Sequence, residues 1–298
     1  MFLRDYVVKV DQDAIAGIHA KLERAHEHFS VLHHEMLVWT QQPRPWLLVP
    51  EVHDQGRKHF LRLHLLEPIP VMWSAILGEA IHDLRSALEQ CVYWLTIDYG
   101  GRPLKDTGFP VNSKRKEFEL WSKSKKTWAP QSGMHKIRGV GPGPQAFIER
   151  LQPYPQRWSR DYVFAVRALH NVWNQDKHRL VHLFGLRFSG DAQLRLNSRV
   201  APYCVPYVDQ RIRHENAIVF TIICDPPHAH VQVGAGSNIP WTVAFSGGRR
   251  RGGGSFSLWD IEGFCTDIAN KLLWAIGRQN ETINVTIWTA PWRPVALL

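Results

Sequence analysis

The chain has 298 residues, of which 44% are hydrophobic and 21% charged, and these ordinary values for a globular protein exclude bulk disorder. The formal net charge of +9 at pH 7 favours anionic partners such as RNA, DNA or acidic lipid. The four cysteines are far apart and form no Cys-x-x-Cys pair, which argues against a zinc ribbon and against a dense disulfide framework.

The first residues, Met1 to Asp5, lead into no apolar h-region, and no run of about 18 apolar residues occurs in the chain. We therefore expect no signal peptide and no transmembrane helix. The default location is a reducing, bacterial-type cytoplasm, with no membrane partner. The sequence leaves the formation of a homodimer open.

A long helix is predicted from residue 11 to 41, with apolar residues at helical spacing along one face. The apolar runs 46–52 and 58–66 follow, and the short polar break with a glycine between them predicts a β-hairpin. The other faces of the first helix carry five histidines, interpreted as solvated side chains: His19, His26, His28, His33 and His34.

The next helix, predicted from residue 70 to 99, has a continuous apolar stripe. Three polar residues, His82, Arg85 and Glu89, lie together on one flank of that stripe because they are spaced by three and four residues. Cys91 faces the stripe itself, so we interpret it as a packing residue and not as a nucleophile.

Residues 101–160 look irregular, with only short helices. A glycine-rich stretch at 139–144 lacks the Gly-Lys-Ser/Thr ending of a phosphate loop and predicts a hinge or turn. The same region contains basic residues interleaved with aromatic ones, which can hold phosphates and stack bases, although a solvated basic helix face explains them equally. The basic residues are Lys114, Arg115, Lys116, Lys123, Lys125 and Lys126, and the aromatic residues are Phe118, Trp121 and Trp128.

A further helix is predicted at 158–184, and Asp176 occupies a position that belongs to its apolar stripe. A carboxylate in such a seam costs several kcal/mol unless it is paired or hydrogen-bonded. Arg85 is the first candidate as its partner, because a guanidinium can meet a carboxylate with two bonds. The alternative is a pair between Arg85 and Glu89 within one helix.

After Phe184 the hydrophobic period changes to that of strands, at 186–188, 193–196, 217–224, 229–233 and 242–245. A flexible basic loop with Arg249, Arg250 and Arg251 could contact an anion or serve only as a connection. The last long helix is predicted at 255–278. We therefore expect a single α+β domain, in which a bundle of about four long helices carries an antiparallel sheet built from 46–66 and 186–246.

The segment Ile76 to Gln90 resembles the hallmark helix of an uncharacterised family of bacterial and phage proteins, whose members carry a Gly-x-x-x-His-Asn-Leu-Arg-Ser-Ala-Leu-Asp-His pattern. Three further segments match that family: Phe109-Pro110, Leu151-Gln152-Pro153-Tyr154 and Asn174-x-Asp176-Lys177-His178-Arg179. The family's Arg-x-x-x-x-His pattern is similar to the signature of HEPN-type ribonucleases, which are small helical bundles that cleave RNA without metal.

The resemblance implies that Arg85 binds phosphate. Asp176, which the hydrophobic pattern pairs with Arg85, is a further candidate residue of the centre. Gln90 stands where the family has its histidine, so His178 or His82 would act as the acid or base. Lys177 and Arg179 would give electrostatic support.

The leading hypothesis is thus a HEPN-like protein that binds RNA or processes it without metal, in phage defence or stress, and that needs no cofactor. Whether it is an enzyme is left open. One alternative is a non-catalytic structural or nucleic-acid-binding module in which Arg85, Asp176 and His82 form a buried polar knot. Another is a bundle metalloenzyme, because Glu79-x-x-His82 and Glu23-x-x-His26 each place two ligands on one helix face.

Overall fold

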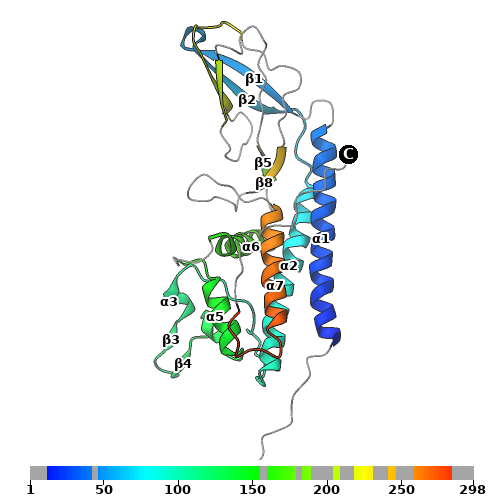
Figure 1. Ribbon diagram of the computed structural model, residues 1–298, viewed down its shortest axis with the longest axis vertical. Helices are drawn as coiled ribbons and strands as arrows, with labels where there is room; N and C mark the ends of the chain where they lie inside the picture. The colour runs from blue at the N-terminus through cyan, green and yellow to red at the C-terminus, as the bar shows by residue number, and fades with distance from the viewer. Residues whose placement is uncertain are drawn as a thin grey trace, which may run out of the picture. The chain divides into compact units, whose positions relative to one another are not determined.

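The structure is a computed structural model that describes residues 12–41, 46–154, 160–178, 183–188, 204–208, 218–230, 241–245 and 258–283. The four long helices predicted by the hydrophobic periodicity are found in these residues. They are α1 (Gln12–Gln41), α2 (Met72–Asp98), α6 (Arg160–His178) and α7 (Leu258–Trp274). Together with antiparallel strands they confirm the α+β class (Figure 1).

The contacts within the chain divide it into two compact units, and the single domain expected from the sequence stays a prediction. Unit 1 comprises Met1–His28, Glu79–Asn174 and Leu258–Leu298, and unit 2 comprises Phe29–Gly78 and Gln175–Ser257. The helices α1, α2 and α6 have residues in both units. Each unit is therefore assembled from segments that are distant in the sequence.

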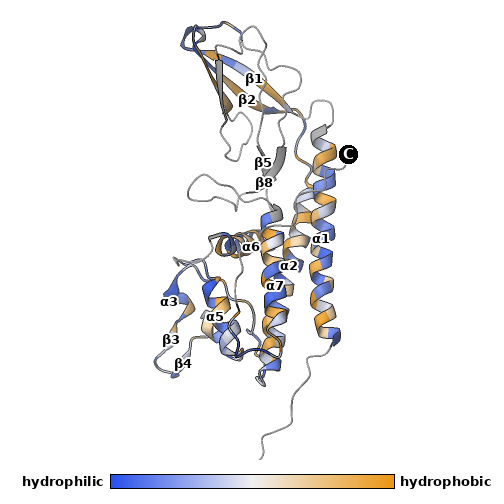
Figure 2. Cartoon of the chain, in the orientation of Figure 1, coloured by the Kyte–Doolittle hydropathy of each residue, from blue (hydrophilic) through white to orange (hydrophobic). Residues whose placement is uncertain are grey.

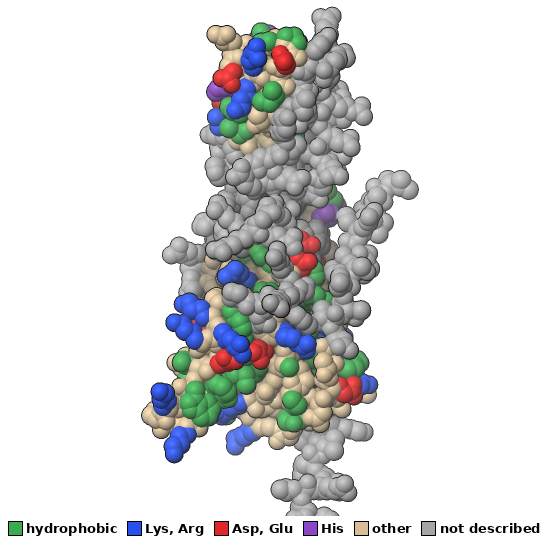
Figure 3. All heavy atoms as spheres, turned by 60° about the vertical axis from the view of Figure 1, so that its left-hand side comes forward, with side chains coloured by type: hydrophobic (Ala, Val, Ile, Leu, Met, Phe, Trp, Pro, Cys, Tyr) green, Lys and Arg blue, Asp and Glu red, His purple; other side chains and the backbone are tan. Residues whose placement is uncertain are grey.

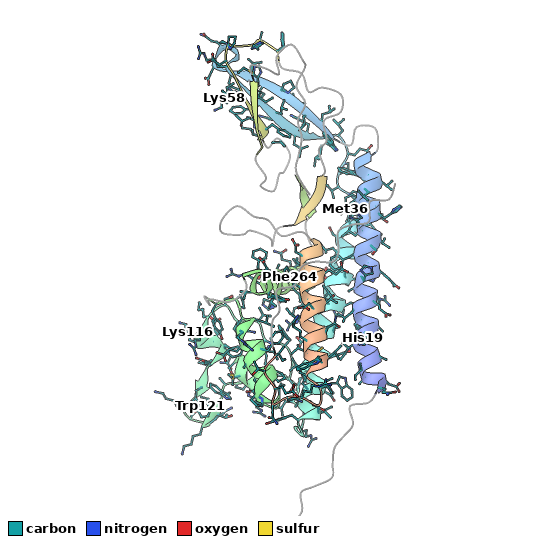
Figure 4. All side chains as sticks on the ribbon, in the orientation of Figure 1. His19, Met36, Lys58, Lys116, Trp121 and Phe264 are labelled. Carbon is teal, nitrogen blue, oxygen red and sulfur yellow. The ribbon has the colours of Figure 1, made fainter. Side chains whose placement is uncertain are left out.

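The core of unit 1 is formed by the apolar stripes of its helices. Figure 2 shows apolar and polar residues alternating along α1, as expected for a helix with one buried face. On α6, Tyr162 packs edge-on against Phe264 of α7, with ring centroids 4.8 Å apart, and donates a hydrogen bond to Asp267 (Figure 4). The fully buried members of the α2 and α7 stripes in this unit include Ile81, Leu84, Leu88, Leu95, Ile261, Ile268 and Leu272.

A buried acid that the hydrophobic pattern did not reveal joins α1 to α2. Asp83 is only 3% exposed. Lys21 Nζ lies 2.7 Å from its Oδ1, and Arg24 Nε lies 3.5 Å from its Oδ2. Because Lys21 and Arg24 are three residues apart, they face the same side of α1 and together offset the desolvation of the carboxylate.

The region from 101 to 154 contains short helices, as predicted, and a small hairpin that was not predicted. The helices are α3 (Arg115–Phe118), α4 (Gly133–Lys136) and α5 (Pro142–Arg150), and the antiparallel hairpin strands are β3 (Trp121–Ser122) and β4 (Thr127–Trp128). The glycine-rich stretch runs directly into α5, with a proline in its first turn, a position that suits proline because its missing N–H is not needed there.

Unit 2 contains a four-stranded antiparallel sheet with the strand order β1-β2-β7-β6. The predicted hairpin is confirmed as β1 (Trp46–His53) and β2 (Lys58–Leu65), joined through a short 3-10 turn, η1 (Asp54–Gly56). The remaining strands of the sheet are β7 (Ile218–Cys224) and β6 (Cys204–Val208). A separate antiparallel pair is formed by β5 (Leu183–Phe188) and β8 (Trp241–Phe245).

Two predictions about this part of the chain were wrong. The helix predicted to reach residue 184 ends at His178, and Leu183 already begins β5, because a short apolar run suits either element. Residues 229 and 230 are not in a strand, whereas the strand at β6 was not predicted. The predicted strand at 193–196 lies outside the described residues.

The second half of α1 belongs to unit 2, where a pair of tryptophans anchors it to the start of α2. Trp39 and Trp73 meet edge to face with ring centroids 5.8 Å apart. The indole N–H of Trp73 donates a hydrogen bond of 2.7 Å to Glu35, so its buried polar atom is satisfied.

Cysteine chemistry differs between the two units. Cys224 of β7 is disulfide-bonded, and its register partner on β6 is Cys204. Cys91 and Cys265, in unit 1, are free and buried, and burial raises the pKa of each thiol to about 12. This confirms the interpretation of Cys91 as a packing residue. Disulfides persist mainly in oxidising compartments, so the reducing cytoplasm stays a prediction.

Candidate nucleic-acid interface and the buried Arg85 centre

The predicted catalytic arginine is a core residue. Arg85 lies in the middle of α2 and is only 4% exposed. Its Nη2 donates hydrogen bonds to the carboxylate of Glu89 and to the backbone carbonyl of Phe109. The pair with Glu89 is the intrahelical alternative that the sequence left open, found here in a buried setting and not at the surface.

Glu89 completes a two-point grip on the same peptide segment. Its Oε2 accepts a hydrogen bond of 2.7 Å from the backbone N–H of Phe109. Arg85 and Glu89 thus hold the C=O and the N–H of one residue, as a neighbouring strand would do. A Cβ at Gly108 would overlap the Glu89 carboxylate, so the approach requires glycine. We call this arrangement of Arg85, Glu89 and the Phe109 backbone the Phe109 clamp.

Two aromatic rings lie beside the guanidinium of Arg85. The Cζ atom of Arg85 lies 5.0 Å from the ring centroid of Trp173 and 5.8 Å from that of Phe109. Such cation–π contacts gain strength where water is excluded. The Phe109 ring is itself fully buried. The clamp therefore fixes an otherwise irregular loop to α2.

The other predicted catalytic residues are His82, Asp176 and His178. Within unit 1, no described contact joins one of them to Arg85. His82 is exposed, and its Nε2 lies 3.4 Å from Ser86 Oγ on the same helix. Asp176 is half-buried in unit 2, where its carboxylate lies against Gly78. Because Asp176 and Arg85 belong to different units, their predicted pairing stays a prediction. The side chain of His178 lies outside the described residues.

The candidate metal ligands make other contacts. Glu79 pairs with His28 at 3.3 Å, and His26 Nδ1 lies 2.6 Å from Glu262 of α7. Burial raises the pKa of Glu262, and the hydrogen bond from His26 acts in the opposite direction. Within the described residues, no three potential ligands come together around one point.

The predicted basic tract falls into two groups. Lys114 pairs with Glu117 at 3.2 Å, and Arg115 makes a two-pronged contact with Glu119 at 2.9 and 3.0 Å. The hydrogen bonds to Glu119 raise the pKa of Arg115. These two cations are therefore neutralised by acids of their own segment, which the sequence spacing of three and four residues could have indicated.

The second group consists of exposed lysines without an acidic partner among the described residues: Lys116, Lys123, Lys125 and Lys126. Between them stands Trp121, which is 49% exposed and meets Trp128 across the hairpin. Figure 3 shows basic side chains over this face of unit 1, with apolar ones beside them, and Figure 4 shows Lys116 and Trp121 on the same side. We call Trp121, Trp128 and these four lysines the basic hairpin surface.

The remaining predicted nucleic-acid contacts belong to unit 2 or fall outside the described residues. Lys177 is exposed on α6 and belongs to unit 2. Arg179, Arg249, Arg250 and Arg251 lie outside the described residues.

Comparison with protein families, curated proteins and solved structures finds no match for this chain. The resemblance to the bacterial and phage family, and through it to HEPN-type ribonucleases, stays a prediction. None of the helices that the structure describes has an apolar stretch long enough to cross a membrane.

Proposed function

We propose that the protein binds RNA through the basic hairpin surface and that the Phe109 clamp serves the fold and not catalysis. The observation that carries the proposal is the cluster of four exposed lysines, for which the described part of the chain holds no acidic partner, around an exposed tryptophan. Lysines can neutralise phosphates, and aromatic rings can stack bases. The formal net charge of +9 acts in the same direction at longer range.

Metal-independent RNA cleavage of the HEPN kind is less well supported than binding. It would need Arg85 at a phosphate, with an acid–base group beside it. The hydrogen bonds of Arg85 go instead to Glu89 and to the Phe109 carbonyl, and the side chain is almost completely buried. The geometry therefore favours the non-catalytic, nucleic-acid-binding alternative.

The test measures the affinity of the full chain for a fluorescent RNA by anisotropy. One variant combines Lys123→Gln with Lys125→Gln, and the matched control combines Lys114→Gln with Arg115→Gln. Both remove two positive charges, but only the control removes cations that are already paired. We expect the first variant to lose about tenfold in affinity and the control much less.

Equal losses in the two variants would mean that only net charge matters, and the proposed surface would be abandoned. Incubation of the RNA with the protein in EDTA gives a second readout. Intact RNA is expected, whereas cleavage that disappears in Arg85→Ala would replace the binding proposal with the ribonuclease.

A further inference from the structure

We infer that the basic hairpin surface recognises single-stranded RNA, with one unpaired base stacked on the indole of Trp121. The inference rests on the proposed function and specifies its substrate class. Two observations support it: the hairpin is formed before binding, and Trp128 supports the exposed ring of Trp121.

Trp121 is presented as a supported ring. It pairs with Trp128 in the hairpin register, and the two rings meet edge to face, with centroids 5.0 Å apart and planes at 89°. Edge-to-face contact at this distance is a favoured aromatic geometry. A perpendicular neighbour can cover at most one face of an indole, so a ring that is 49% exposed retains surface on which a base can stack.

The turn that carries the lysines is held in place by hydrogen bonds within the hairpin. The Lys125 N–H donates to Ser122 Oγ at 3.4 Å, and the Ala129 N–H donates to the Leu120 carbonyl at 2.8 Å, which extends the ladder beyond the strands. Lys126 has a left-handed backbone with φ of 49°. A hairpin that is formed before binding loses less conformational entropy on binding than a flexible loop would lose.

A single strand is the form of RNA that can use both parts of this surface. In a duplex the bases are stacked on one another and the major groove is too deep and narrow for side chains, so only phosphates and sugars would be met. In a single strand a base can turn out and stack on an aromatic ring, while neighbouring phosphates meet the lysines. The lysines should therefore act on all RNA forms, and Trp121 only on strands with free bases.

The experiment compares three fluorescent ligands by anisotropy, at one salt concentration and with the full chain. They are a mixed-sequence single strand, the blunt duplex of the same sequence, and an abasic single strand with the same number of phosphates. The variants are Trp121→Ala and Trp121→Phe, together with the double variant Lys123→Gln with Lys125→Gln.

For the normal chain we expect the single strand to bind more tightly than the duplex or the abasic strand. Trp121→Ala should lose about tenfold in affinity for the single strand and little for the other two ligands. Trp121→Phe keeps an aromatic ring and should retain most of the affinity. If Trp121→Ala fails to fold, as judged by circular dichroism, Trp121→Phe and the abasic strand decide the question.

Equal affinity for the normal and abasic strands, or an equal effect of Trp121→Ala on all three ligands, would overturn the inference. If the duplex and the abasic strand still bind in a lysine-dependent way, the proposed RNA-binding function survives that failure. If no RNA binds, both fail together. Vesicles of phosphatidylserine and phosphatidylcholine provide the last arm, and Trp121-dependent binding to them without a preference for single strands would assign the surface to anionic membranes instead.

Discussion

Arg85 and Glu89, one helical turn apart on α2, hold the backbone C=O and N–H of Phe109 at the same time. Arg85→Ala would remove the donor to that carbonyl and leave Glu89 beside it without its cation. Because Arg85 is buried but the Glu89 side chain is half-buried, breaking this ion pair is expected to lower the free energy of unfolding by about 2 kcal/mol, measured by urea denaturation.

The matching double variant, Arg85→Met with Glu89→Leu, should be less destabilised than the sum of the two single variants, because neither charge is left unpaired. RNA affinity of the folded Arg85→Ala protein should equal that of the normal chain. A large loss of affinity at unchanged stability would instead place Arg85 in the binding site.

The two glycines at positions 78 and 17 give a matched pair of predictions within helices. A Cβ at Gly78 would overlap the Asp176 carboxylate, whereas a Cβ at Gly17 on α1 meets nothing within 4 Å. Gly78→Ala should therefore lower the melting temperature, and adding Asp176→Ala should recover part of the loss. Gly17→Ala should raise stability by about 0.5–1 kcal/mol through helix propensity alone. If both substitutions stabilise the protein, the contact between Gly78 and Asp176 does not form.

Glu262 should make stability fall as the pH rises. Burial raises its pKa above the ordinary value of a glutamate, so the folded state binds its proton more tightly than the unfolded state does. Stability is then lost progressively as the pH rises from the unfolded pKa through the folded one. Melting curves between about pH 4 and pH 7 should show this loss in the normal chain and not in Glu262→Gln.

Glu51 on β1 provides a control of opposite sign. The hydrogen bond from Arg62 lowers its pKa, so its contribution is present above its unfolded pKa and lost as the pH falls through the folded one. Glu51→Gln should therefore remove a gain in stability with rising pH. Identical pH profiles for the normal chain, Glu262→Gln and Glu51→Gln would contradict both assignments.

Binding of single-stranded RNA should depend on salt through the lysines of the basic hairpin surface. Each phosphate contact with a single strand contributes about 0.7 to the slope of log K against log salt concentration. Lys123→Gln with Lys125→Gln should thus lower the magnitude of the slope by about 1.4. Trp121→Phe should leave the slope unchanged, since stacking releases no counterions. A slope insensitive to the lysines would contradict their contact with phosphate.

Thiol counting tests the difference between the two units. Cys91 and Cys265 are buried, with raised pKa values, and should resist alkylation in the native chain. In urea without reductant these two should react and Cys224 should not, whereas after reduction all four cysteines should react. Labelling of all four without reductant would mean that Cys224 is not disulfide-bonded.

The fold was predictable where one periodicity extends over many residues. The helices α1, α2 and α7 and the hairpin β1–β2 follow from regular apolar spacing, which leaves little choice between elements. The end of α6 was mistaken because the apolar residues after His178 fit a strand as well as a helix. The hairpin β3–β4 has strands of two residues each, too short for any period to show.

The polar centre was predictable in part. The sequence offered two carboxylates as partners of Arg85, Asp176 as the first candidate and Glu89, four residues further on, as the alternative, and the structure shows the pair with Glu89. What sequence could not provide was the third partner, because a main-chain carbonyl such as that of Phe109 has no sequence signature. The partners of Asp83 could not be predicted either, because Lys21 and Arg24 lie on another helix and are distant in the sequence.

Internal pairing of Lys114 and Arg115 reduces the basic tract to four lysines, enough to cover about four consecutive nucleotides. A footprint of that size implies brief occupancy of any one stretch of RNA. Long residence would require several copies of the protein bound to one RNA strand. Copies that are tethered together would therefore bind RNA with far higher affinity than a single copy.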